Sequence, residues 1–139
     1  MRFHALVFVA GGLLFAADTD KEKLQGTWRA VSAERSGQAM KKADQHSLNF
    51  DGENFAIKRA GQIMLKGTFK LDSTKSPKTI DMTPDDGPQK GQPSQGIYLL
   101  DGDNLKWCSA EPGKDDRPVE FATNTDTSYM LVIFKKEKP

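Results

Sequence analysis

Apolar and polar residues alternate with a period of two along several short segments of this chain. The clearest example is the segment 62–71, where every second residue is apolar or glycine: Ile63, Leu65, Gly67, Phe69 and Leu71. The residues between them, including Met64, are expected to face water. Residues 79–83 alternate again, and residues 27–34 also have the composition of a strand. Alternation of this kind predicts β-strands with one face in the core and one face in solvent.

Two Asp-Gly pairs predict β-hairpins. Asp51-Gly52 separates residues 48–50 from 53–57, and Asp101-Gly102 separates residues 97–100 from 103–107. Asp-Gly between alternating apolar residues is a strong signal for a type I′ turn, which needs positive φ at both central positions. We therefore expect a type I′ turn centred on each pair.

The remaining segments complete an all-β pattern. Residues 119–123 and 129–135 are predicted strands, whereas residues 39–45 are predicted to form a short helix or a loose connection. The chain thus contains roughly eight to ten short strands and no long amphipathic helix, as is typical of all-β sandwiches and barrels. A meander that closes on itself is the simplest topology, because closure removes the exposed sheet edges. The predicted fold is a small antiparallel β-barrel.

Three predicted strands begin with a glycine two residues before an aromatic residue. The pairs are Gly26 with Trp28, Gly67 with Phe69, and Gly96 with Tyr98. Glycine at such a point allows another backbone to approach closely and allows the tight coiling of a small barrel. We expect Gly26, Gly67, Gly96 and Trp28 to be structural, with the Trp28 ring closing one end of the barrel.

The first 17 residues resemble a secretory signal peptide. They contain one Arg, a short apolar run over residues 5–15 and small residues at Ala16 and Ala17, after either of which cleavage is expected. The apolar run is too short to cross a bilayer as a helix. An uncleaved N-terminal anchor is the alternative. We therefore expect export of a single barrel domain formed by residues 18–139.

Charge and cysteine content exclude several kinds of partner and site. The 20 Lys and Arg residues nearly balance the 19 Asp and Glu residues, so no strong field attracts nucleic acid or an anionic membrane. Cys108 is the only cysteine and is expected to be a buried free thiol. A catalytic Cys would need a base, and after the leader the chain offers only His46.

Gly26-Thr27-Trp28 resembles the Gly-X-Trp signature of lipocalins, in which the Trp closes one barrel end and a basic residue near the last strand, usually Arg, packs over its ring. Lys135 or Lys136 would be that residue here. Nearly the whole chain after the leader is also similar to an uncharacterised lipocalin-like family found mainly in planctomycete bacteria, whose members are often exported. The matching segments are, in order, LQGTW, VSAE, LNFDGENF, GTFKLD, PKTIDMTP, GPQKG, GIYLLDGDNLKWC and RPVEF. The resemblance implies a lipocalin-like β-barrel and no particular catalytic residues.

No motif in the chain indicates catalysis, a metal or another cofactor. The turn residues Asp51, Asp101 and Asp103 are expected to support their turns through local hydrogen bonds. No His/Cys cluster has zinc-ligand spacing, and no glycine-rich loop has the context of a phosphate site. We therefore expect a non-catalytic protein, and a hydrolase that uses His46 is the weakest alternative.

Aromatic residues are the candidates for a binding site. Tyr98 and Trp107 flank the second Asp-Gly hairpin and, with Phe69, are predicted to line a pocket for a small, partly apolar ligand in the barrel mouth. A chain this short is expected to fill most of its barrel and leave at most a shallow cavity. The loops 84–93 and 111–118 are predicted to form the rim or a surface for a protein partner. The alternative function is a protein-interaction or cell-envelope structural module whose barrel is packed solid.

Overall fold

The structure, a computed structural model, describes residues 19–138, so the predicted leader over residues 1–17 lies outside the described residues. Residues 19–24 are helical. The strands that follow are β1 (Gly26–Arg35), β2 (Gln38–Ala39), β3 (His46–Asp51), β4 (Asn54–Arg59), β5 (Gln62–Asp72), β6 (Lys78–Pro84), β7 (Ser94–Asp101), β8 (Asn104–Ser109) and β9 (Met130–Lys136), with the 3-10 helix η1 (Ala43–Gln45) before β3. No helix among the described residues is long and apolar enough to span a membrane.

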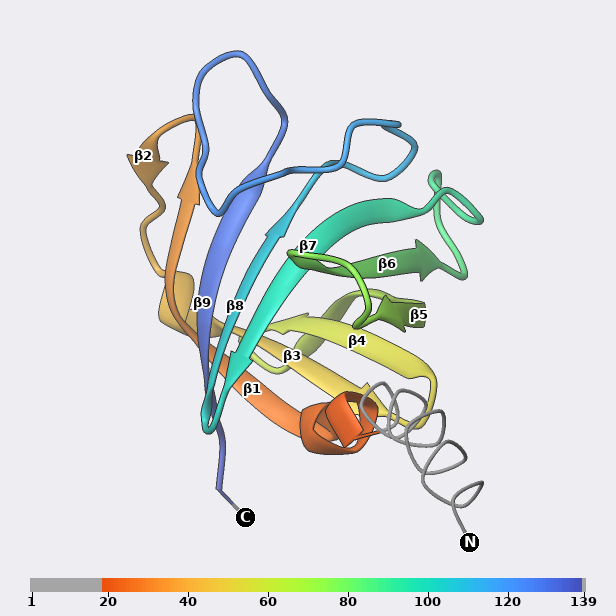
Figure 1. Ribbon diagram of the computed structural model, residues 1–139. Helices are drawn as coiled ribbons and strands as arrows, with labels where there is room; N and C mark the ends of the chain where they lie inside the picture. The colour runs from red at the N-terminus through yellow and green to blue at the C-terminus, as the bar shows by residue number, and fades with distance from the viewer. Residues whose placement is uncertain (1–18, 139) are drawn as a thin grey trace, which may run out of the picture.

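Eight of these strands form a closed antiparallel barrel (Figure 1). Their order is β1-β3-β4-β5-β6-β7-β8-β9, and β9 pairs back with β1 to complete the circle. The short β2 adds a hairpin extension to the far end of β1. Each strand therefore pairs with its neighbour in sequence, apart from the β1–β9 closure. This arrangement confirms the predicted small all-β barrel.

The two Asp-Gly hairpins form where they were predicted, but their turn type differs. Asp51 pairs with Asn54, and Asp101 pairs with Asn104, so each aspartate is the last residue of its strand. The central turn positions begin with Gly52 (φ 63°) and Gly102 (φ 59°), and the residue after each glycine has no positive φ. Glycine at the first central position is the pattern of a type II′ turn. The expectation of type I′ turns centred on Asp-Gly was therefore wrong by one residue.

A β-bulge changes the inward pattern at the start of β5. Ile57 pairs with Leu65 and Lys58 pairs with Ile63, so Met64 is an extra residue in this pair of strands. A bulge re-aims the side chains around it. Ile63, expected inward, is 55% exposed, whereas Met64, expected to face water, is 56% exposed and also lines the cavity of the barrel. Alternation along β5 holds only beyond the bulge.

The predicted strand over residues 119–123 is wrong. These residues belong to an irregular segment, residues 110–129, which packs against the outside of the barrel. The Arg117 guanidinium lies 2.8 Å from a carboxylate oxygen of Asp81, and the Cys108 thiol donates to the Ala122 carbonyl oxygen at 3.7 Å. Cys108 and its cross-strand partner Ile97 are both almost fully buried. Cys108 is thus the buried free thiol that the sequence predicted.

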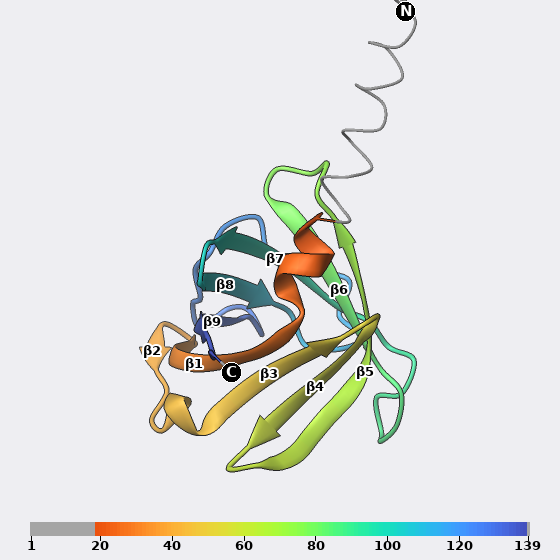
Figure 2. The same cartoon turned by 90° about the horizontal axis from the view of Figure 1, so that it is seen from below.

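One end of the barrel is closed around Trp28. Its ring is fully buried and its indole N–H donates to the Leu24 carbonyl oxygen at 2.8 Å, which holds the helical residues 19–24 against the barrel (Figure 2). The Lys136 ammonium lies 4.8 Å from the Trp28 ring centroid and donates to the carbonyl oxygens of Lys23 and Gln25. Burial lowers the pKa of Lys136. Of the two lysines proposed to cover this ring, Lys136 is the one in contact.

Two of the strand glycines lie where strands come very close. A Cβ on Gly67 would lie 1.9 Å from the Thr83 carbonyl oxygen, and a Cβ on Gly96 would lie 2.9 Å from the Cys108 carbonyl oxygen. Gly26 instead has a φ of +110°, which side chains rarely allow.

Candidate functional site

The barrel encloses a cavity of about 370 Å³ at the end opposite Trp28. Its walls come from the C-terminal half of β1, the segment from Met40 to Leu48, and parts of β4, β5, β6, β7, β8 and β9. Both ends of the segment 110–129 contribute to the lining through Ala110, Glu111, Pro112 and Ser128. The expectation of a mostly filled barrel with at most a shallow cavity was therefore wrong.

Side-chain size explains why the interior is full at one end and hollow at the other. Along β1 the inward residues change from Trp28 to Ala30 and Ala33, and along β7 they change from Tyr98 to Gly96 and Ser94. Each of these two strands therefore presents a large ring near the closed end and small side chains near the open end. A barrel of eight strands holds a ligand only where its inward side chains leave space.

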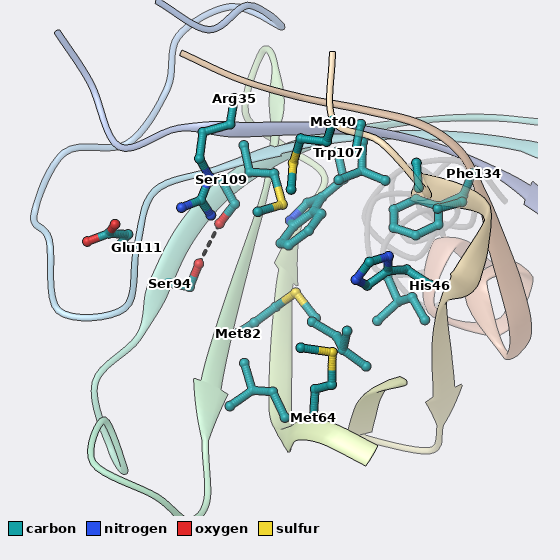
Figure 3. A pocket seen from close by; sticks show the side chains of 18 of the residues that line it. Arg35, Met40, His46, Met64, Met82, Ser94, Trp107, Ser109, Glu111 and Phe134 are labelled. Carbon is teal, nitrogen blue, oxygen red and sulfur yellow. Dashed lines mark hydrogen bonds between the residues drawn. The ribbon is translucent and has the colours of Figure 1, made fainter. Parts of the chain in front are cut away.

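Four methionines line the cavity from separate parts of the chain. They are Met40, Met64, Met82 and Met130, and they account for every methionine after Met1. Figure 3 shows Met40, Met64 and Met82 with their side chains in the cavity. Methionine has an unbranched, polarisable side chain that adapts to contacts of different shapes. These side chains give the cavity an adaptable apolar wall.

The cavity also has an aromatic wall formed by Trp107 and Phe134, whose ring centroids lie 6.3 Å apart. Trp107 is the direct cross-strand partner of Tyr98 and was predicted to line a pocket. Its indole N–H is buried and has no hydrogen-bond acceptor within the described part of the chain. Leaving such a donor unpaired costs about 1–3 kcal/mol.

The other two predicted pocket residues, Tyr98 and Phe69, do not line this cavity and lie toward the closed end. The Phe69 ring packs edge-on against Phe50, with centroids 4.7 Å apart. The Tyr98 hydroxyl donates to a carboxylate oxygen of Asp20 at 2.7 Å, and the Lys78 ammonium lies 2.9 Å from the same oxygen. Burial and the bond to Asp20 raise the pKa of Tyr98. Tyr98 thus ties the helical residues 19–24 to the barrel.

Polar groups also line the cavity. The hydroxyl groups of Ser94 and Ser109 are hydrogen-bonded to each other (Figure 3). The Ser94 hydroxyl also donates to the Ala110 carbonyl oxygen at 2.6 Å. The charged or titratable residues in the lining are Arg35, Lys41, His46 and Glu111. None of these four side chains makes an ion pair within residues 19–138.

Of the two predicted rim loops, only the second contributes to the lining. Glu111 and Pro112 line the cavity, together with Ser128 from the end of the same irregular segment, whereas no residue between Pro84 and Ser94 does.

His46, considered above as a base, lies in the cavity wall at the start of β3 (Figure 3). Its ring has no hydrogen-bonded serine or carboxylate in the described residues. Those residues also contain no group of three or more His, Cys, Asp or Glu side chains arranged to hold a metal ion.

The methionines and Arg35 were not singled out from the sequence. The sequence does contain a signal for the cavity, namely the small inward residues at one end of β1 and β7. This signal can be recognised only when the register of the strands is known. A scan of the chain against protein-family models gives no match, and a search of the curated proteins finds none that matches.

Proposed function

We propose that the protein binds a small, partly apolar molecule in the cavity at the open end of the barrel, without converting it chemically. The observation that carries this proposal is the cavity of about 370 Å³, which lies within the size range of small-molecule sites. Its lining combines adaptable methionines, the Trp107 and Phe134 rings and a few polar groups at the mouth. Mostly apolar walls with a small number of polar groups are typical of ligand sites.

The size of the cavity sets the size of the ligand. An apolar cavity of roughly 150 Å³ holds benzene. By proportion, a cavity of about 370 Å³ accommodates up to roughly fifteen non-hydrogen atoms. N-phenyl-1-naphthylamine, a neutral fluorophore whose emission rises in apolar surroundings, slightly exceeds this limit, but the cavity is open to solvent and does not have to enclose it completely, so it is a suitable probe.

The test is a fluorescence titration of the protein with this probe, repeated on two matched variants. Ala33→Phe places a ring in the cavity, whereas Ser32→Phe places the same ring on the neighbouring, exposed position of β1. We expect saturable binding to the wild type and to Ser32→Phe, and at least about tenfold weaker binding to Ala33→Phe. Absence of saturable binding to the wild type, or equal affinity in both variants, would contradict the proposal.

We further propose that the chain is exported and belongs to the lipocalin-like family that its sequence resembles. Supporting this are the apolar leader, the Gly26-Thr27-Trp28 signature and the Lys136 ammonium over the Trp28 ring. Mass spectrometry of the protein from its native cells tests export. A mature chain that begins immediately after Ala16 or Ala17 is expected, and an intact leader on all recovered protein would contradict it.

A further inference from the structure

The cavity mouth carries more positive than negative charge. Arg35 and Lys41 carry positive charge, whereas Glu111 is the one acidic residue in the lining. The molecule as a whole is almost neutral, with a formal net charge of +1. The local excess is therefore a property of this mouth and does not reflect the composition of the chain.

The position of Arg35 in the barrel directs its side chain toward the cavity. Arg35 is paired across the sheet with Met130, and Ala33 is paired with Val132. Directly opposed residues share one face of a sheet, and Ala33, Met130 and Val132 all line the cavity. Arg35 is thus the last inward-facing residue of β1. Figure 3 shows its guanidinium on the side of the cavity where Ser94 and Ser109 lie.

The unpaired guanidinium of Arg35 favours a carboxylate as its partner. It presents several N–H donors in a planar fork that matches a carboxylate, and such bonds are stronger than those between neutral groups. Because the methionine-lined interior continues directly behind it, the complementary molecule has an anionic head and an apolar tail. The adaptable methionine side chains suit a flexible tail better than a single rigid ring system.

We infer that the ligand is an anionic amphiphile, such as a medium-chain carboxylate, whose head binds Arg35 at the mouth and whose flexible tail lies among the four methionines. This inference rests on the proposed function, because it assigns the chemistry of the molecule in that same cavity. Lys41 adds to the attraction for the head, and Glu111 opposes it. A decanoate ion is within the size limit set by the cavity.

The test compares three amphiphiles with the same tail: decanoate, decanol and decyltrimethylammonium. Each is titrated against the protein loaded with N-phenyl-1-naphthylamine, at low and at high salt. We expect decanoate to displace the probe at the lowest concentration. High salt should weaken decanoate binding and leave decanol binding almost unchanged, because salt screens only the charged head.

Three variants test whether the preference for decanoate arises from the charged residues at the cavity mouth. Arg35→Gln should weaken decanoate binding about three- to tenfold, as expected for loss of a partly exposed charged pair. Glu111→Gln should strengthen it, by about twofold, because it removes a repelling charge. Arg29→Gln is the matched control, since Arg29 lies on the outer face of the same strand and lines no part of the cavity. It changes the net charge equally and should leave decanoate affinity unchanged.

The possible results separate this inference from the proposed function. If decanol binds as tightly as decanoate, or if Arg35→Gln and Arg29→Gln have the same decanoate affinity, the inference of an anionic head group is refuted. The proposed function, binding in the cavity, is not affected by that result. If decyltrimethylammonium binds best and Glu111→Gln weakens it, the head has the opposite charge and the inference is overturned. If neither the probe nor any amphiphile binds, the proposed function itself fails.

Discussion

Replacing Trp28 with alanine tests whether the closed end of the barrel supports the fold. The Trp28 side chain is fully buried, donates a hydrogen bond to Leu24 and is covered by the Lys136 ammonium. Truncating a buried aromatic residue to alanine typically costs about 3–5 kcal/mol. We expect the upper half of that range, because the change also leaves the Leu24 carbonyl oxygen without its donor.

This loss corresponds to a large shift in melting temperature. For a domain of this length, 1 kcal/mol shifts the melting midpoint by roughly 3–5 °C. Trp28→Ala should therefore melt about 12–25 °C below the wild type. Urea unfolding followed by far-ultraviolet circular dichroism gives the free energy of unfolding directly. Intrinsic fluorescence is unsuitable, since the variant removes one of only two tryptophans.

Trp107→Ala is the matched control, because Trp107 is only partly buried and its indole N–H has no acceptor to lose within the described residues. It should cost at most about 2 kcal/mol, and it should weaken binding of the fluorescent probe, which Trp28→Ala should not. The reasoning is refuted if Trp28→Ala unfolds within about 1 kcal/mol of the wild type, or if Trp107→Ala proves to be the more destabilising change.

Three further substitutions or modifications test particular contacts. Gly67→Ala should lower the free energy of unfolding by more than about 3 kcal/mol, because its Cβ would collide with the Thr83 carbonyl oxygen at 1.9 Å; a near-neutral urea midpoint would show that these strands separate easily. Tyr98→Phe should cost about 1.5–3 kcal/mol through loss of the hydrogen bond to the Asp20 carboxylate, and unchanged thermal stability would mean that this bond contributes nothing. Cys108 should react with Ellman's reagent only as fast as the protein unfolds, because burial raises the pKa of its thiol and the thiolate is the reactive form; labelling at the rate of free cysteine would contradict its burial.

The strands and their order around the barrel could be predicted because their signals are local. Alternation over five to ten residues marks a strand whatever lies beside it. The glycines at 52 and 102 mark tight turns even though the type of turn was mistaken, since both Asp-Gly and Gly-X turns require glycine. Once consecutive strands are joined by short turns, an antiparallel meander follows, and closure is the simplest way to cover its edges.

The features that were mistaken depend on contacts between segments. The bulge at Met64 exists only in relation to the register with β4, so the alternation of β5 alone assigned Ile63 to the core, although its side chain is largely exposed. Residues 119–123 have a strand-like composition but find no open edge, because β8 already pairs with β9. The barrel circle is complete without them. They lie instead in the irregular segment over the outer face, held through Arg117 and Ala122.

The cavity shows why aromatic residues were an incomplete guide to a binding site. Tyr98 and Phe69 were chosen because large rings often form pocket walls, yet a large ring in a narrow barrel fills space. Space for a ligand arises where inward residues are small, as at Ala30, Ala33 and Ser94. That pattern becomes visible only when the strands are aligned around the barrel, because each small residue is unremarkable within its own segment.

Under the proposed function, the two ends of the barrel divide stability from binding. At the closed end, Trp28 and the Tyr98–Asp20 bond hold the helical residues 19–24 in place, and the interior is packed. At the open end the chain gives up the packing contacts that larger inward side chains would make. In the proposed function, a bound molecule restores those contacts in an interior lined by small residues and methionines, with a free guanidinium at its entrance. A ligand that combines an apolar tail with an anionic head satisfies both the unfilled volume and the unpaired charge.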